Sequence, residues 1–430
     1  MRFEDLEEKL LSRRIYGEFV RPAYGDYCLS SVPATVLSCL GVETKRPRLP
    51  KEHLEMEGAD KVVLFVADGL GYYDALHNAR ERGFLRDATS RGSLIPLTTV
   101  FPSTTAAALT TLSTGLTPQE HCLPEWFVYM KEVQAVIATL PFSAVGDVGR
   151  DALVGKVSPR ILFSGKTIHS ALRSSGVRSF AFVNSYLART AYSKLAYAGS
   201  EVVPYITSSD LMASLRKRLE EAKRPTYFYV YWEKVDTIEH AYAPGTEQSN
   251  SEISLLSYLL KKELLDRLGR RAASETLFLM TADHGQLKVS REVTYLNSFG
   301  PLARSLKRAP SGKAIPPWGS ARDVYMDVEE ERLEAVESHL SKRLGRDAVV
   351  LKTAEAVNAG LFGLGKPKPR FLDRVGNLMI LPRKNKVVWY KYRRGARFEI
   401  RGHHGGLSPR EMLIPFVASR LSALQRSPAS

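Results

Sequence analysis

The sequence predicts an α/β fold built on a mostly parallel sheet. Hydrophobic runs with strand character alternate with segments of helical periodicity, which is typical of βαβ units. Three of these runs break on an aspartate, at Asp68, Asp236 and Asp283. Carboxylates at the carboxyl ends of buried parallel strands lie in the crevice where such sheets bind ligands. The three breaks therefore predict one common site.

The expected elements divide the chain into a main domain and a smaller insertion. Strands are expected at 61–67, 95–100, 178–184, 227–232 and 276–282, and helices after Pro102, at 211–223 and at 254–268. Residues 1–50 are expected to form an N-terminal extension with a helix and a proline-containing lead-in. Residues 290–372 combine Gly/Pro-rich loops with one helical segment, which predicts an inserted cap. The core would then comprise 51–289 and 373–430.

Length and composition favour a folded protein without membrane segments. The chain has 430 residues, 44% of them hydrophobic, which can fill a substantial core. Its first fifteen residues carry charges throughout, and no stretch approaches eighteen apolar residues, so neither a signal peptide nor a membrane span is expected. Cys28, Cys39 and Cys122 have no metal-type spacing and are too few for a disulfide framework. We therefore expect a cytoplasmic protein.

The positive charge is concentrated near the C-terminus. The net charge is +15, which favours an anionic substrate, a nucleic acid or an acidic surface as partner. Residues 366–401 contain twelve Lys or Arg and two acids, interleaved with Trp389, Tyr390, Tyr392 and Phe398. The favoured interpretation is a solvated basic hairpin around a turn at 383–385. The alternative is a surface that grips phosphates and stacks bases.

Metal-ligating residue types gather at the same strand ends. The sequence contains Asp236-x-x-x-His240, Asp283-His284, Asp68 and the Gly-His-His-Gly loop at 402–405. Carboxylates mixed with imidazoles suit zinc, manganese or a similar divalent ion rather than calcium. Six or seven donors are too many for one catalytic ion, which keeps a position open. Two ions about 4 Å apart would use them all, and such pairs serve phosphoryl transfer.

The segment VFPSTTAAALTTLSTG supplies a candidate nucleophile. Pro102 and Ser103 are good helix-start residues, so Thr104 or Thr105 falls in the first turn, where free N–H groups favour an oxyanion. A threonine hydroxyl becomes a nucleophile at neutral pH when a divalent cation binds it. The alternative is an ordinary helix N-cap.

These motifs in this order resemble the type I phosphodiesterase/nucleotide pyrophosphatase family of the alkaline phosphatase superfamily, over residues 60–420. The segments that carry the resemblance are Asp68, FPSTTAAALTTLSTGLTPQEH, Asp236-x-x-x-His240, TADHG and GHHGGLSPREMLIPF. It implies an alkaline-phosphatase-like three-layer sandwich with a cap, and two divalent ions: zinc, with manganese or iron as alternatives. One ion would be held by Asp68, Thr105, Asp283 and His284, and the other by Asp236, His240 and His404. His404 is preferred to His403 because the family has a histidine directly before glycine.

Two departures from the family pattern concern substrate recognition. Where the family's eukaryotic-type nucleotide pyrophosphatases place a phosphate-binding asparagine, this sequence has the region around Trp126. The phenylalanine-proline-asparagine that follows their nucleophile is replaced by Ala106, Ala107 and Ala108.

The resemblance implies a hydrolase that cleaves phosphodiester or pyrophosphate bonds of small anionic, nucleotide-type substrates through a phosphothreonine at Thr105. A phosphomonoesterase or a phosphonate hydrolase could use the same site. A nucleic-acid-binding protein on an idle scaffold is a further alternative, which the presence of every ligand disfavours. Among the remaining histidines, His53, His77, His169 and His339 are expected at the surface or as caps, whereas His121 follows the nucleophile helix and is a candidate to support the site.

Overall fold

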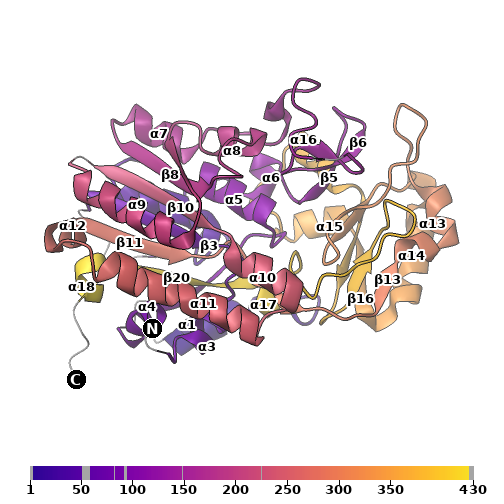
Figure 1. The fold of residues 1–430 in the computed structure, drawn as a ribbon. Coiled ribbons are helices and arrows are strands. Elements are labelled where there is room, and N and C mark those ends of the chain that lie inside the picture. The colour runs from indigo at the N-terminus through magenta and orange to yellow at the C-terminus, as the bar shows by residue number, and fades with distance from the viewer. Residues whose placement is uncertain are drawn as a thin grey trace.

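A seven-stranded mixed sheet forms the centre of the protein in the computed structural model, which describes residues 3–50, 59–81, 83–91, 94–147, 149–223 and 225–425 (Figure 1). The strand order is β4-β20-β11-β3-β10-β8-β9. The run from β11 to β9 is parallel, whereas β20 is antiparallel to both β11 and β4. The strands are β3 Lys61–Ala67, β4 Leu94–Thr98, β8 Arg178–Asn184, β9 Glu201–Tyr205, β10 Thr226–Trp232, β11 Thr276–Thr281 and β20 Leu413–Arg420.

Helices cover both faces of this sheet, as Figure 1 shows. One layer contains α2 Val32–Cys39, α5 Thr105–Thr114, α7 Ile168–Ser174 and α8 Ala191–Ala196, and the other contains α3 Tyr72–Asn78, α4 Phe84–Ser90, α9 Ser208–Glu221 and α11 Glu247–Leu259. The helix expected at 254–268 is observed as the end of α11 followed by a π-helix, η4 Leu260–Leu265. The predicted α/β class is confirmed.

The three central strands explain why the strand spans could be predicted closely. Every residue of β3, β10 and β11 is buried. A strand covered by helices on both faces reads as a continuous hydrophobic run, because neither face meets water. The predicted strands match β3, β8, β10 and β11 to within one residue at each end.

Smaller sheets lie beside the central one. The largest has the order β14-β15-β17-β16 and packs against α14. Residues 378–382, expected to belong to the returning core, form β17 in this sheet, and the chain re-enters the central sheet only at β20. A short hydrophobic run fits either sheet, so composition alone does not assign it. The domain boundaries stay a prediction.

The remaining elements complete the connections around these sheets. The strands are β1 Arg14–Ile15, β2 Phe19–Val20, β5 Phe127–Met130, β6 Ala135–Ala138, β7 Ser143–Ala144, β12 Leu287–Lys288, β13 Val293–Tyr295, β14 Trp318–Gly319, β15 Val324–Met326, β16 Ala348–Lys352, β17 Leu378–Pro382, β18 Val387–Trp389 and β19 Gly402–His403. The helices are α1 Phe3–Leu11, α6 Pro118–His121, α10 Lys234–Tyr242, α12 Arg270–Glu275, α13 Gly300–Ser305, α14 Leu333–Leu344, α15 Thr353–Asn358, α16 Pro369–Val375, α17 Pro409–Met412 and α18 Leu421–Gln425.

The basic segment 366–401 does not form the expected hairpin. Within the described chain β17 pairs with β15 and β16, and β18 pairs in parallel with β13, so the two strands do not pair with each other. One of its cations is structural. Arg374 is buried and donates hydrogen bonds to the backbone carbonyls of Cys122 and Leu162. The hairpin expectation was wrong because each strand pairs with a strand from another part of the sequence.

No helix in the described ranges is long and apolar enough to span a membrane. All three cysteines are free thiols, and no disulfide joins them. The cytoplasmic location stays a prediction.

Candidate metal centre and nucleophile

Helix α5 begins at the candidate nucleophile, Thr105. The preceding Thr104 is the N-cap, and its Oγ1 accepts a hydrogen bond from the backbone N–H of Ala107 at 3.4 Å, so this hydroxyl serves the helix. Thr105 Oγ1 instead lies 3.1 Å from Nε2 of His284. The free N–H groups and dipole of the first helical turn favour negative charge at this place. Of the two threonines that the sequence left open, Thr105 has the hydroxyl that faces the candidate metal ligands.

Two strand-end carboxylates converge on the same imidazole. Asp68 follows β3 and Asp283 follows β11, and these strands are parallel neighbours. Nε2 of His284 lies 3.5 Å from Asp68 Oδ1 and 3.3 Å from Asp283 Oδ2. Both carboxylate oxygens are buried without a hydrogen-bond partner in the protein. Buried, unpaired carboxylate oxygens are costly, and a bound cation would satisfy them together with Thr105.

Helix α10 and the loop after β19 supply the remaining predicted donors. Nε2 of His240 lies 3.3 Å from Asp236 Oδ1, and Nε2 of His404 lies 3.6 Å from the same oxygen. The donor atoms fall into three overlapping groups, each with all atoms within 4.8 Å: Asp68, Asp283 and His284; Asp236, His284 and His404; His240, His403 and His404. All the predicted ligands therefore meet at one edge of the sheet.

Backbone carbonyls orient the imidazoles. Nδ1 of His240 lies 2.8 Å from the carbonyl of Gly402, and Nδ1 of His404 lies 2.9 Å from the carbonyl of Ser103. A carbonyl only accepts, so in both rings Nδ1 carries the proton and Nε2 presents a lone pair. Burial lowers the pKa of His404 well below its usual value, which keeps the ring neutral. Both Nε2 atoms are thus prepared to bind a metal.

A close backbone approach at Gly69 brings two of the carboxylates together. The backbone N–H of Asp236 donates to the carbonyl of Asp68 at 3.0 Å. Gly69 has φ +78°, and a Cβ there would lie 2.7 Å from Cα of Asp236, so only glycine fits. Burial raises the pKa of Asp68 well above its usual value, and the charges of Asp283 and Asp236 raise it further. Such crowding of carboxylates favours a cation between them.

Two side chains that hold the carboxylates were not found from the sequence. The hydroxyl of Tyr231 donates to Asp68 Oδ2, and Nε2 of Gln286 donates to Asp236 Oδ1 at 2.6 Å. Tyr231 is the last of three tyrosines that alternate along β10, and a tyrosine in a buried strand needs a partner for its hydroxyl. That alternation was the available signal for Tyr231. For Gln286 the only signal was its position two residues after His284 in the sequence.

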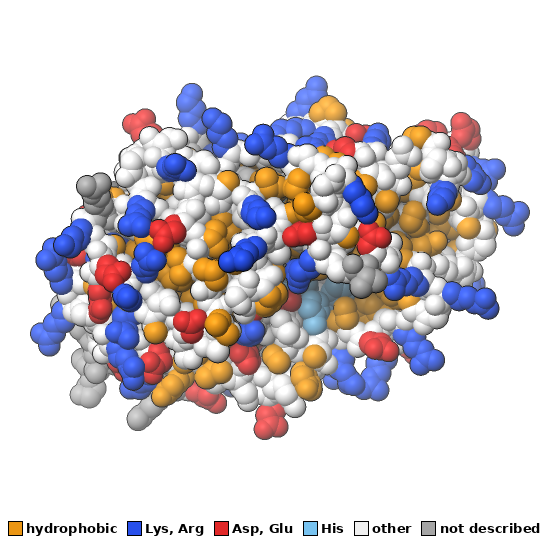
Figure 2. All heavy atoms as spheres, turned by 45° about the horizontal axis from the view of Figure 1, so that its top comes forward, with side chains coloured by type: hydrophobic (Ala, Val, Ile, Leu, Met, Phe, Trp, Pro, Cys, Tyr) orange, Lys and Arg blue, Asp and Glu red, His pale blue; other side chains and the backbone are white. Residues whose placement is uncertain are grey.

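Two cavities meet at the nucleophile. One, of about 150 Å³, includes Arg150 and Tyr186 in its lining. The other, of about 450 Å³, is lined on one side by Trp389 and Phe398 of the basic segment. Three residues line both cavities: Thr105, Trp126 and Asp236. Space is therefore available beside the candidate nucleophile, and Figure 2 shows histidine side chains set in a hollow of the surface.

Residues with weaker sequence signals have other surroundings. Glu233 lines the smaller cavity, where it accepts hydrogen bonds from Asn184 and Tyr205. The expectation that His169 lies at the surface or caps a helix was wrong. Thr167 caps α7, and this face of the helix packs against the tyrosines of β10, which leaves the His169 side chain 1% exposed. His77 and His339 are exposed as expected, and His53 lies outside the described residues.

Fold and site together define an α/β protein with Asp and His donors grouped beside a helix-start threonine. Residues 62–407 match the family described as Type I phosphodiesterase / nucleotide pyrophosphatase, and the chain belongs to this family. The resemblance carried by the sequence motifs is confirmed. A search of curated proteins gave no significant match.

Solved structures share the fold at low sequence identity. Murine ectonucleotide pyrophosphatase / phosphodiesterase 5 superposes with a TM-score of 0.60 at 19% identity, covering 83% of this chain and 87% of that one. The human protein of the same name gives 0.58 at 15%, with the same coverages. Phosphonoacetate hydrolase from Sinorhizobium meliloti 1021, in complex with phosphonoformate, gives 0.58 at 18%, covering 89% and 97%. The fold is therefore alkaline-phosphatase-like.

Proposed function

We propose that this protein is a two-metal hydrolase that cleaves phosphodiester or pyrophosphate bonds of nucleotide-type substrates through a phosphothreonine at Thr105. The observation that carries the proposal is the position of Thr105 Oγ1, 3.1 Å from Nε2 of His284. The unpaired oxygens of Asp68 and Asp283 converge on the same nitrogen. A hydroxyl within such a donor set is placed to act as an activated nucleophile.

The donors divide into two sets. The inner donor set would hold one ion and consists of Asp68, Thr105, Asp283 and His284. The outer donor set would hold the other ion and consists of Asp236, His240 and His404. Mixed oxygen and nitrogen donors suit zinc, with manganese or iron as alternatives. When bound, the two cations would supply Lewis-acid activation of the threonine and phosphoryl oxygens.

The residues of the chain would act in two steps. In the first, Thr105 Oγ1 loses its proton to solvent and forms a bond to phosphorus, while the bond from phosphorus to the leaving-group oxygen breaks. In the second, water attacks phosphorus, the bond to Oγ1 breaks, and Thr105 is regenerated. Two inversions give retained configuration. Because the family's asparagine is missing from the region around Trp126, the metal ions, the first-turn N–H groups of α5 or a basic side chain would stabilise the phosphoryl oxygens.

The two cavities support a diester rather than a monoester. A diester or pyrophosphate carries a substituent on each side of the reacting phosphorus, and two cavities adjoin Thr105 that could receive them. Each cavity also has an arginine in its lining, Arg150 in the smaller and Arg397 in the larger. These positive charges suit an anionic substrate.

The test is a hydrolysis panel on metal-replete protein. It compares an aryl phosphate monoester, an aryl diester, a nucleotide pyrophosphate and a phosphonate by kcat/KM. We expect the diester or the pyrophosphate to be preferred. A preference of more than about tenfold for the monoester or the phosphonate, which is about 1.4 kcal/mol, would overturn the proposal in favour of that activity. Absence of all four activities, with tight nucleic-acid binding, would favour a binding protein.

A further inference from the structure

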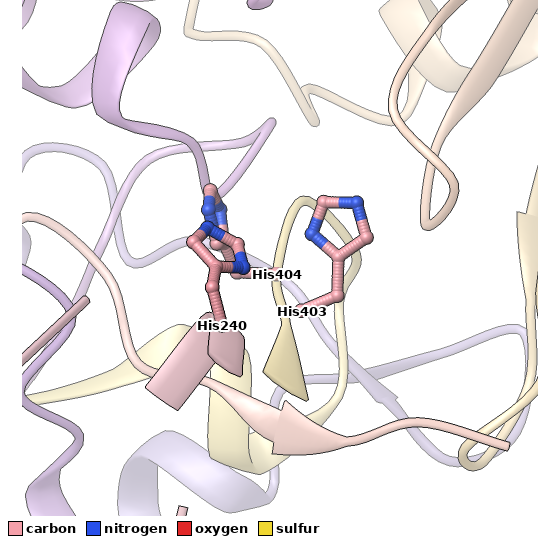
Figure 3. A group of neighbouring side chains, drawn as sticks. All are labelled: His240, His403 and His404. Atoms are coloured by element: carbon pink, nitrogen blue, oxygen red, sulfur yellow. The ribbon is translucent and has the colours of Figure 1, made fainter. Parts of the chain in front are cut away.

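A third histidine stands beside the outer donor set. The rings of His240, His403 and His404 are arranged nearly symmetrically, with centroid separations of 5.5, 5.2 and 5.3 Å. One ring nitrogen from each residue lies within 4.8 Å of the other two. Figure 3 shows one nitrogen of His403 on the side of its ring that is turned toward His240 and His404. The three imidazoles can therefore reach a single ion.

The free nitrogen of His403 sets it apart from its neighbours. The residue is 9% exposed, and its Nδ1 is buried without a hydrogen-bond partner in the protein. In contrast, Nδ1 of His240 and Nδ1 of His404 both donate to backbone carbonyls. A buried imidazole nitrogen without a partner is unfavourable unless a ligand satisfies it. The rings of His240 and His404, both candidate metal ligands, lie 5.5 and 5.3 Å from that of His403.

We propose that His403 is a ligand of the outer metal ion, so that this ion is held by Asp236, His240, His403 and His404. The inference rests on the proposed two-metal site and extends it, because the family pattern points only to the histidine before glycine. Both adjacent histidines reach the ion because β19 ends at His403 and the chain turns at once toward Gly405, where φ is +123°. These four residues would hold the ion, which would supply Lewis-acid activation of a phosphoryl oxygen.

The additional imidazole makes the two ion positions chemically unequal. The inner donor set offers three oxygens and one nitrogen, whereas the extended outer set offers three nitrogens and one oxygen. Imidazole donors suit zinc, and carboxylate and hydroxyl oxygens suit manganese or magnesium. We therefore expect zinc to fill the outer position first and manganese to compete only for the inner one.

The experiment measures metal binding by the full-length protein. His403→Ala, and His403→Gln as a variant that preserves side-chain volume, are titrated with Zn²⁺ against a chelator and loaded with Co²⁺ for visible absorption. His404→Ala is the comparator that removes a predicted ligand. His339→Ala is the matched control, because His339 is exposed on α14. Thermal unfolding of each metal-free protein checks that the variants are folded.

The expected result is two ions per wild-type chain, and one retained and one weakened ion in both His403 variants. The weakened ion should lose at least about tenfold in affinity, with an altered Co²⁺ spectrum. If both ions bind His403→Gln as tightly as the wild type, with the same spectrum, the proposal is overturned. His403 is then a wall of the larger cavity, where its ring already lies 5.7 Å from that of Phe398.

The same data separate this inference from the proposed function. A wild-type protein that binds two ions but hydrolyses no phosphate ester would refute the function and leave the His403 result intact. A wild-type protein that binds only one ion would refute the His403 assignment whatever its activity.

Discussion

The inner and outer donor sets differ in burial and in the elements that carry them. Asp68, Asp283 and His284 have side chains 0–3% exposed and follow two neighbouring strands of the central sheet. Asp236 and His240 have side chains 18% and 27% exposed and project from α10. The inner set is therefore part of the core, while the outer set borders the larger cavity.

We therefore expect the two donor sets to have different roles. Donors at the ends of buried strands are held in one geometry. A nucleophile needs this support, because its oxygen must be aligned with the reacting atom to within a fraction of an ångström. Donors beside an open cavity can meet substrate and water. Changes in the inner set should therefore affect both chemistry and folding stability, and changes in the outer set should affect mainly metal affinity and turnover.

The largest effect is expected at Thr105. Thr105→Ala should lower kcat/KM by at least about 10³-fold, because the nucleophile is lost while the donors remain. Thr105→Ser should keep measurable activity. The assay uses the best diester of the panel, and mass spectrometry of acid-quenched wild-type protein looks for one added phosphoryl group. Loss of less than tenfold would mean that water attacks phosphorus directly.

Asp283→Asn should separate activity from stability within the inner set. Activity should fall by roughly 10²-fold or more, since the cation loses a charged ligand. The metal-free protein should instead be more stable than the metal-free wild type, because one of the charges that raise the pKa of Asp68 is removed. Urea unfolding with and without chelator measures the stability of the metal-free and the metal-bound protein. Equal destabilisation in the two conditions would contradict the cation site.

The raised pKa of Asp68 also sets a pH dependence for metal-free protein. The pKa of Asp68 is higher in the folded protein than in the unfolded chain, where it is near 4. Ionising this carboxyl therefore costs more in the folded protein, and stability is lost as pH rises from the unfolded pKa through the folded pKa. The contribution of Asp68 to the unfolding free energy of the metal-free wild type should therefore fall with pH over this window. In Asp283→Asn this contribution should fall less steeply with pH. In metal-saturated protein it should not fall.

His240→Ala tests the outer set. We expect activity to fall by roughly 10²-fold at limiting zinc, with partial recovery when zinc is in excess. The free energy of unfolding should change by less than about 1 kcal/mol, because the side chain is partly exposed. His339→Ala should behave as wild type in both measurements. A large loss of stability would remove the distinction between the two sets.

Substitution of the two side chains that donate hydrogen bonds to the carboxylates should have smaller effects, one on each ion. Tyr231→Phe removes the donor to Asp68, and Gln286→Met removes the donor to Asp236. Each should weaken one ion by about tenfold in a chelator competition, Tyr231→Phe the inner and Gln286→Met the outer. Reversal of that pairing would show that the carboxylates are assigned to the wrong ions.

The smallest effect is expected at the wall of the larger cavity. Trp389→Ala should raise KM for a diester with a bulky second substituent by several-fold, in line with about 1 kcal/mol for an aromatic contact. KM for a small aryl monoester should not change. If both substrates are affected equally, the cavity does not receive the second substituent.

Most of the central fold and the candidate donor residues could be predicted from the sequence, because both depend on the buried strands. Strands covered on both faces require continuous hydrophobic runs, so β3, β10 and β11 could be located, and the carboxylates that end two of them could be recognised. The smaller sheets were harder, because their strands are only two to five residues long. β17 and β18 follow one another along the chain yet pair with different partners.

By itself, the sequence determined the α/β alternation, the Asp and His donors and the helix that begins at Thr105, since each depends on local pattern and residue chemistry. Only the tertiary structure decided which of these side chains meet. The approach at Gly69, the hydroxyl of Tyr231 behind Asp68 and the free nitrogen of His403 depend on contacts between elements distant in the chain. Such contacts are set by how layers pack, and no local pattern encodes them.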